Sequence, residues 1–158
     1  MRRFSVNKGQ GLSYNVLMLR IIWSIGITKD AELLRYEVFT LEQGFKKEDD
    51  VDEIDRYADE VVVYEDDIAV ATARLFQEDD SIYHIGRLCV KNAYRGRGFG
   101  KLVLQEAERK AKEKGGKEIR LGAQYDKAGY YEKLQYRKET GELFDDAGYP
   151  HYMMVKIL

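Results

Sequence analysis

The spacing of apolar and polar positions along the chain predicts an alternation of strands and helices. Apolar, β-branched runs predict strands over residues 16–25, 81–90, 117–123, 135–141 and 150–158. The run 60–76 predicts a β-hairpin that turns at residues 65–67. Helical spacing predicts helices over residues 28–44, 98–115 and 126–134, and a short one within 49–57. The order β-α-α-β-β-β-α-β-α-β-β indicates a mixed α/β domain.

Two of the predicted helices have recognisable ends and inward faces. Thr28 is an N-cap for the first helix and Gly44 closes it, while its apolar positions recur at helical spacing at Leu33, Leu34, Val38 and Leu41. The helix at 98–115 ends at Gly115–Gly116. Its inward positions are Leu102, Leu104, Ala107 and Ala111.

Length and composition indicate one soluble globular domain. The chain has 158 residues, of which 44% are hydrophobic and 34% charged, without an internal repeat or a linker. A formal net charge of −2 gives no electrostatic reason to expect a nucleic-acid partner. No apolar run approaches the roughly 20 residues needed to span a bilayer, so no membrane association is expected. We expect residues 16–158 to form the domain, with 1–15 as a disordered leader or a doubtful start site.

The single cysteine, Cys89, excludes an internal disulfide and fits a reducing, cytoplasmic location. Together with His84 and His151 it shows no zinc-ligand spacing, so no metal site is expected.

An acidic segment covers residues 46–67, with eleven acidic residues against three basic ones. The simpler interpretation is a solvated loop that contains the short helix at 49–57. The alternative is a loop over an active site that repels acidic substrates or attracts amines.

The stretch 95-RGRGFG-100 lies between a predicted strand and a predicted helix. Such a turn directs unpaired backbone N–H groups at one point, where the helix dipole favours an anion. Arg95 and Arg97 add bidentate cationic donors, so the stretch indicates a pyrophosphate-like ligand, with a plain tight turn as the alternative. No Gly-Lys-Ser/Thr follows, and the Gly-x-Gly-x-Gly spacing does not fit a dinucleotide fingerprint.

The context of this stretch resembles a known family. "LCVKNAYRGRGFGKLVLQEAERKAKEKG" is similar to the coenzyme A signature of the GCN5-related N-acetyltransferase (GNAT) family, with Val90 ending the strand and Arg95, Gly98 and Gly100 at the diagnostic positions. "AGYYEKLQY" resembles the second family motif, with Tyr131 at the catalytic tyrosine, although Gln135 stands where the family usually has glycine. Two further pieces, within 35–45 and 121–154, resemble the ElaA/YjcF-type branch.

The resemblance implies an α/β fold of the GNAT type, a mixed and mostly antiparallel sheet that is splayed in the middle and flanked by helices. It also implies transfer of an acetyl group from acetyl-CoA directly to an amine. The implied cofactor-binding residues are Leu88, Cys89, Val90, Arg95, Gly96, Arg97, Gly98, Phe99, Gly100 and Lys101.

The implied reaction requires an oxyanion donor, a general acid and a general base. The N–H of Val90 is the expected oxyanion donor. Tyr131 is the expected general acid, because a phenol with a pKa of about 10 is protonated at neutral pH. Tyr130 and Tyr136 are expected to pack, and Cys89 is either a nucleophile or, as we favour, a small core residue.

The general base is the least determined role. The candidates are Glu37, Glu42, His84 and His151, of which Glu42 and His84 are favoured. A chain of water molecules is the alternative to all four.

The function that the sequence favours is N-acetylation of a small-molecule or peptide amine. A non-catalytic acyl-CoA-binding or sensing module is the main alternative, and a nucleotide-binding domain is the third. The loops at 43–57 and 141–150 are expected to select the acceptor, and their acidic residues (Glu48, Asp49, Asp50, Asp145 and Asp146) suggest a cationic one. A strand-mediated homodimer is compatible with the resemblance.

Overall fold

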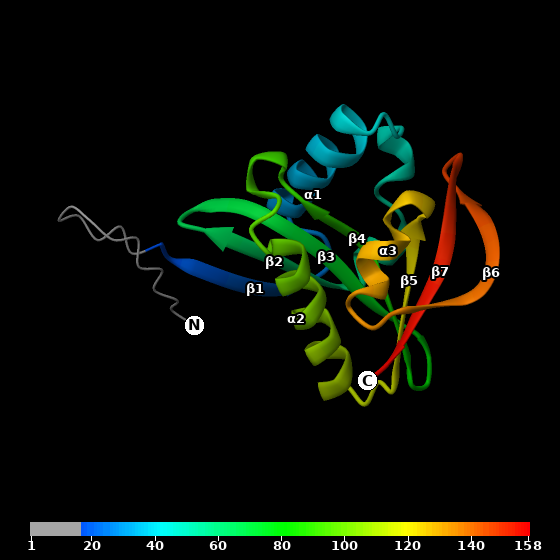
Figure 1. Cartoon of the computed structure of the whole chain (residues 1–158). Coiled ribbons are helices and arrows are strands. Elements are labelled where there is room, and N and C mark those ends of the chain that lie inside the picture. Colours follow the sequence, from blue (N-terminus) through cyan, green and yellow to red (C-terminus); the bar gives the residue numbers. More distant parts are fainter. Residues whose placement is uncertain (1–16) are drawn as a thin grey trace, which may run out of the picture.

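One seven-stranded sheet organises residues 17–158, the part of the chain that this computed structural model describes (Figure 1). The strand order is β1-β2-β3-β4-β5-β7-β6, and only the β4–β5 pair is parallel. The expected leader at 1–15 lies outside the described residues. The strands are β1 Leu19–Ile25, β2 Asp59–Glu65, β3 Ile68–Asp79, β4 Ile82–Val90, β5 Glu118–Gln124, β6 Arg137–Asp146 and β7 Tyr149–Ile157.

Helices cover both faces of this sheet, in the predicted order along the chain. Ala71, Ala73 and Leu75 of β3 pack in one core with α2, whereas the residues between them face α1, because side chains alternate along a strand. No helix among residues 17–158 is both long and apolar enough to cross a membrane. The helical elements are α1 Lys29–Arg35, the π-helix η1 Tyr36–Glu42, α2 Phe99–Glu113 and α3 Ala128–Glu132, with 3₁₀ turns η2 Lys47–Asp49, η3 Glu53–Arg56, η4 Asn92–Tyr94 and η5 Tyr125–Lys127.

The larger core lies between α2 and the sheet. Leu104, Ala107 and Ala111 are buried as predicted, while Leu102 is only partly buried. Val103 joins them against the valines of β2. Each fully buried aliphatic side chain of this size contributes roughly 1.5–3 kcal/mol, so this helix is held mainly by its apolar face.

The first predicted helix is correct in extent but wrong in its inward face. Thr28 Oγ1 caps it by accepting from Ala31 N at 3.2 Å. Leu34 and Val38 are buried, but Leu33 is 56% and Leu41 65% exposed. Leu33 lies outside the buried stripe of α1, and the change to π-helical geometry in η1 rotates Leu41 outward. A 3.6-residue period extrapolated along the chain cannot anticipate that rotation.

β4 and β5 pair only at their first residues and then separate, which confirms the predicted splay. Their register runs from Ile82 opposite Glu118 to His84 opposite Arg120 and ends there. β4 stays on β3, but its register shifts between Gly86 and Cys89, and Arg87 has a left-handed φ of 53°. This β-bulge bends β4 where the two strands part.

The acidic segment is not the solvated loop that we predicted. Asp50, Asp55 and Glu60 are buried in an ionic cluster around Arg35, which is 0% exposed. Arg35 Nη1 donates to Asp55 Oδ1 at 2.8 Å, and Arg74 Nη1 to Asp52 Oδ1 at 2.7 Å. The helix predicted at 49–57 is two short 3₁₀ turns, η2 and η3, held on the sheet by these contacts. The sequence suggested a solvated segment because the arginines that pair with these acidic residues, Arg35 and Arg74, lie outside the segment.

The last hairpin is longer than predicted. β6 continues to Asp146, so residues 141–150 form two paired strands and a tight turn, where a loop was expected. Ala147 and Gly148 both have positive φ, at 53° and 81°, as a two-residue hairpin turn requires.

Gln135 ends α3 with a left-handed φ of 72°, the conformation that glycine adopts without strain. We therefore expect Gln135→Gly to stabilise the protein by about 1 kcal/mol, because a side chain costs roughly 1–2 kcal/mol in this conformation. Thermal unfolding would show the melting temperature rising by about 2–4 °C. Gln135→Ala keeps the strain and should change little, so an equal gain in both variants would contradict this explanation.

Glu60 completes the ionic cluster with a carboxyl group whose pKa burial raises, which favours its neutral form. Three arginines (Arg35, Arg74 and Arg87) already face three aspartates (Asp50, Asp52 and Asp55). Thr72 Oγ1 lies 2.7 Å from Glu60 Oε1 and 2.8 Å from the Val61 carbonyl, and one hydroxyl proton cannot serve both. Burial raises the pKa of Glu60 to about 7, against the opposing effects of Thr72 and Arg35.

Because its pKa is higher in the folded state, Glu60 stabilises the fold at acidic pH, and this contribution is lost as pH rises toward and through 7. Glu60→Gln, which mimics the neutral acid, should therefore be more stable than the wild type at pH 8, by on the order of 1 kcal/mol or more. Urea unfolding at pH 5 and pH 8 measures the difference. Glu48→Gln, at an exposed position, is the control, and an equal loss of stability in Glu60→Gln at both pH values would indicate an ionised Glu60.

Candidate active site

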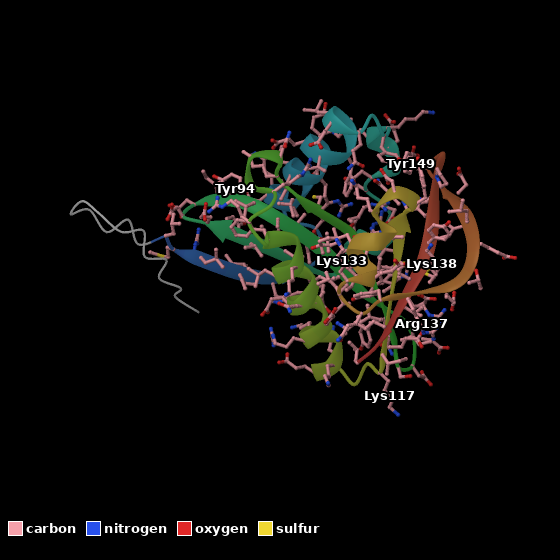
Figure 2. All side chains as sticks on the ribbon, in the orientation of Figure 1. Tyr94, Lys117, Lys133, Arg137, Lys138 and Tyr149 are labelled. Carbon is pink, nitrogen blue, oxygen red and sulfur yellow. The ribbon has the colours of Figure 1, made fainter. Side chains whose placement is uncertain are left out.

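A cavity of about 400 Å³ occupies the opening between β4 and β5. One wall comes from η1 and the loop after it, the second from β3 and β4, and the third from β5, α3 and the β6–β7 hairpin. Figure 2 labels Tyr94, which precedes α2, and Tyr149, at the hairpin end of β7, on different sides of this opening. The cavity thus lies between the elements on the β4 side and those on the β5 side of the separated strand pair.

The glycine stretch forms the predicted turn at the start of α2. Gly96 and Gly98 have φ of 73° and 87°, and a Cβ at either would meet no atom within 4 Å, so the space above the turn is open. Leu102 N is the first amide to bond back, to Gly98 O at 3.0 Å. Within residues 17–158 no backbone oxygen accepts from the N–H groups of residues 96–101. These groups and the helix dipole fit a pyrophosphate.

Both arginines of this stretch are paired with carboxylates, and their direct role in binding an anion stays a prediction. Arg95 forms a two-fold ion pair with Glu42 of η1 and donates from Nε to the Val90 carbonyl at 3.0 Å. Arg97 pairs with Glu65 at the β2–β3 turn and lies over the ring of Phe99, which is buried. Both guanidinium groups therefore hold the loop in this structure, and the backbone N–H groups are donors without a partner among residues 17–158. Lys101 is exposed in the first turn of α2.

The end of β4 presents its backbone to the opening. Lys91 N donates to Val70 O on β3 at 2.8 Å, so by alternation the N–H and C=O of Val90 point away from β3. The bond from Arg95 to the Val90 carbonyl agrees with this direction. The Val90 N–H is thus turned to the splay, as an oxyanion donor must be, and the Leu88 side chain lines the cavity.

Cys89 points to the other face of β4. Its side chain packs with Leu34 and Val38 of the first helix and does not line the cavity. Burial raises the pKa of the Cys89 thiol far above its usual range, so the thiolate that a nucleophile requires is strongly disfavoured. The geometry favours the core residue over the nucleophile.

The tyrosines in and after α3 differ in their surroundings. Tyr131 lines the cavity, and its hydroxyl has no hydrogen-bond partner among residues 17–158. Burial raises the pKa of Tyr131 above its usual value, so the phenol keeps its proton at neutral pH. Tyr136 is buried and donates to Glu108 of α2 at 2.9 Å. Tyr130 is half exposed, and its hydroxyl would lie 3.0 Å from a Cβ at Gly100.

His84 lies at the point where β4 and β5 separate and lines the cavity. Its Nδ1 lies 3.0 Å from Glu78 Oε2, and its ring stacks on Phe76 at 5.0 Å. Burial lowers the pKa of His84 below 6.5, although the Glu78 carboxylate acts in the opposite direction. The ring is therefore neutral at pH 7. With Nδ1–H donating to Glu78, Nε2 carries the free lone pair that a base needs.

The other candidate bases differ in position. Glu42 is paired with Arg95, whose hydrogen bond lowers the pKa of Glu42, and it does not line the cavity. Glu37 pairs with Lys91 at 2.6 Å and is also absent from the lining. His151 does line the cavity, with its Nδ1 2.8 Å from the Tyr149 carbonyl. Of the two favoured candidates, only His84 stands where a substrate proton could reach it.

Several cavity residues were not anticipated from the sequence. Gln124 Nε2 donates to Gln43 Oε1 at 2.9 Å, which joins the end of β5 to the end of η1. Phe144 of β6 reaches across β7 to Gly122 of β5, where a Cβ would lie 3.1 Å from its ring. An isolated glycine within a strand is a signal of close approach, so Gly122 could have been noticed, whereas nothing marked its partner.

Comparison with known proteins identifies the family of this chain. A family model described as an acetyltransferase (GNAT) domain matches residues 32–158. YjcF of Bacillus subtilis, an uncharacterized N-acetyltransferase, is 33% identical over 128 residues, which cover 81% of this chain and 91% of YjcF.

Solved structures share the fold. The crystal structure of Escherichia coli ElaA matches 87% of this chain and 99% of its own with a TM-score of 0.73 at 25% identity. A Bacillus subtilis acetyltransferase, crystallised in complex with CoA, matches 89% of this chain and 99% of its own with a TM-score of 0.69. At 18% identity that second likeness shows the fold alone. The chain therefore belongs to the acetyltransferase (GNAT) family, and its splayed sheet is the fold of the acyl-CoA N-acyltransferases.

Proposed function

We propose that this protein transfers the acetyl group of acetyl-CoA directly to a primary amine of a small molecule or peptide. One observation carries the proposal: β4 and β5 separate around a cavity that both His84 and Tyr131 line, and β4 leads into a row of unbonded amides at the start of α2. The crystallised CoA complex of a protein with this fold supports CoA as the carrier.

The chain's own backbone would hold the coenzyme. The N–H groups of residues 96–101 form no backbone hydrogen bond within residues 17–158, and they lie at the positive end of a 15-residue helix, where Gly96 and Gly98 leave the space open, which suits a pyrophosphate. Beside them, the outward-facing backbone of Val90 offers its N–H as a donor along the free edge of β4, while its carbonyl accepts from Arg95 Nε. Bound there, acetyl-CoA would supply an activated thioester.

Three groups then divide the chemistry. His84 Nε2 accepts the proton that the amine loses as its nitrogen bonds to the acetyl carbon. The Val90 N–H stabilises the charge that develops on the carbonyl oxygen, and needs no reorganisation because the fold fixes it. Tyr131 donates its proton to the sulfur as the C–S bond breaks, and the raised pKa of this phenol keeps the proton available. With Cys89 turned away and held as a thiol, transfer is direct, without an acyl-enzyme.

Release of free thiol from acetyl-CoA across a panel of amines tests the activity. Tyr131→Phe should lower kcat by about 100-fold, the scale of general-acid catalysis, while leaving the Kd for CoA within about twofold. Tyr130→Phe, its neighbour outside the cavity lining, is the matched control and should keep most of the activity. CoA binding without turnover of any amine would contradict the proposed activity and would indicate a non-catalytic CoA-binding module.

The base is tested by the pH dependence of kcat/KM. His84→Gln should lose about 100-fold and the acidic limb of the profile. Glu78→Gln keeps a hydrogen-bond acceptor but removes the charge that raises the pKa of His84. The limb should therefore move to lower pH, even though Arg74 and Arg120 also act on this ring. His151→Gln is the control from the same cavity, and loss of the limb there instead would transfer the role to His151.

A further inference from the structure

We infer that the acceptor is a compact primary amine with a flat, aromatic or similarly apolar body and no carboxylate. This inference rests on the proposed function, because it assigns the substrate class of the same cavity. It is carried by the shape and chemistry of the wall formed by Phe144, Gly122 and His151, and by the internal pairing of the cavity's charges.

The first wall is an aromatic surface that Gly122 makes possible. Phe144 lies on the edge strand β6, yet its ring reaches Gly122 two strands away and stacks on His151 between them, with 5.6 Å between ring centroids and a tilt of 31°. Any side chain at 122 would displace the ring. Phe144 remains 37% exposed, so this flat apolar face is open to a ligand.

The opposite wall closes the space to a slot. Phe39 and Phe45 line it from η1 and the following loop. Phe45 meets Tyr149 edge to face at 6.2 Å, and Gln43 meets Gln124, so the two walls touch at the rim. A cavity of about 400 Å³ must also admit the thioester, and ligand pockets run to roughly 1,000 Å³, so the acceptor has to be small.

The two arginines that line the slot are largely paired within the protein. Arg74 donates both Nη atoms to Asp52 at 2.7 and 2.9 Å, and its buried Nε, which has no hydrogen-bond partner among residues 17–158, lies beside Gly86. Arg87 donates hydrogen bonds to the backbone carbonyls of Asp49 and Asp50. Among residues 17–158, Lys127 is the one lining lysine or arginine without an ion pair, so a substrate carboxylate would have to compete for it with the carboxylates of Asp49 and Asp146.

The groups that remain favour a cation. Among residues 17–158 the lining carboxylates of Asp49 and Asp146 have no ion-pair partner, and a single ammonium, Lys127, stands against them. His151 donates its Nδ1–H to the Tyr149 carbonyl at 2.8 Å, so its Nε2 is an acceptor. An ammonium entering along the aromatic faces is also attracted by their π-electrons.

Four amines separate the possibilities in the thiol-release assay with saturating acetyl-CoA. 2-Phenylethylamine is the probe, and phenylalanine adds only a carboxylate to it. Putrescine and Nα-acetyl-lysine methylamide represent polyamines and peptide lysines. We expect kcat/KM for 2-phenylethylamine to exceed each of the others by at least about tenfold, the discrimination that apolar pockets achieve. Preference for any of the other three overturns the inference but leaves the acetyltransferase in place.

Two variants locate the selectivity. Phe144→Ala should raise KM for 2-phenylethylamine about tenfold, and Phe144→Leu should raise it less. Leu143→Ala, next to it on β6 but exposed and outside the lining, is the matched control and should change KM by less than about twofold. An unchanged KM in Phe144→Ala would contradict the assignment of this wall.

A binding measurement keeps the inference independent of turnover. Calorimetric titration of 2-phenylethylamine into the protein saturated with CoA, which cannot react, should give a Kd at least about tenfold lower than that of phenylalanine or putrescine. If no amine is acetylated but this order of affinity holds, the proposed activity fails and the aromatic slot stands. Equal or absent binding of 2-phenylethylamine overturns the slot itself.

Discussion

The separation of β4 from β5 after His84 is the constraint on which the rest of the molecule depends. Beyond that point the inner edge of β4 has no partner strand, and buried backbone groups without partners cost roughly 1–3 kcal/mol each. The bulge at Arg87 maintains the separation, because its positive φ bends β4 and its guanidinium ties the bend to the loop after η1. The open edge, the cavity and the free amide of Val90 are consequences of one interrupted strand pair.

The buried ionic cluster supports that opening from one side. Arg35 joins the first helix to Asp50 and Asp55, and Arg74 joins Asp52 to β3, so the loop that walls the cavity is fixed to the sheet by charge. Such clusters hold a specific arrangement at little net gain in stability, because desolvation offsets most of the attraction. Burial shifts Glu60 toward its neutral form, which favours a balance of three arginines against three aspartates. Because this loop is fixed, Phe45 on it and Phe144 on the opposite wall keep defined positions in the cavity.

Much of the fold could be predicted because its signals are local. The hairpin at 60–76, the helix after the glycine stretch and the order of elements depend on periods of two or 3.6 residues and on turn residues. The errors share a cause. Leu41 turned outward through a π-helix, and Asp50 and Asp55 became buried through an arginine at position 35, and neither event is visible within a local window.

By itself the sequence determined the amide-rich turn at residues 95–100 and the tyrosine at the end of α3, since each is encoded within a few consecutive residues. The splayed sheet was expected only because the sequence resembles a family that has one. The tertiary structure alone decided that Arg95 and Arg97 face carboxylates, that His84 and not Glu42 reaches the cavity, and that Phe144 reaches across β7 to Gly122. Those outcomes depend on ion-pair partners 32 or more positions apart and on how the strands are arranged in the sheet. Only the folded chain brings such residues together.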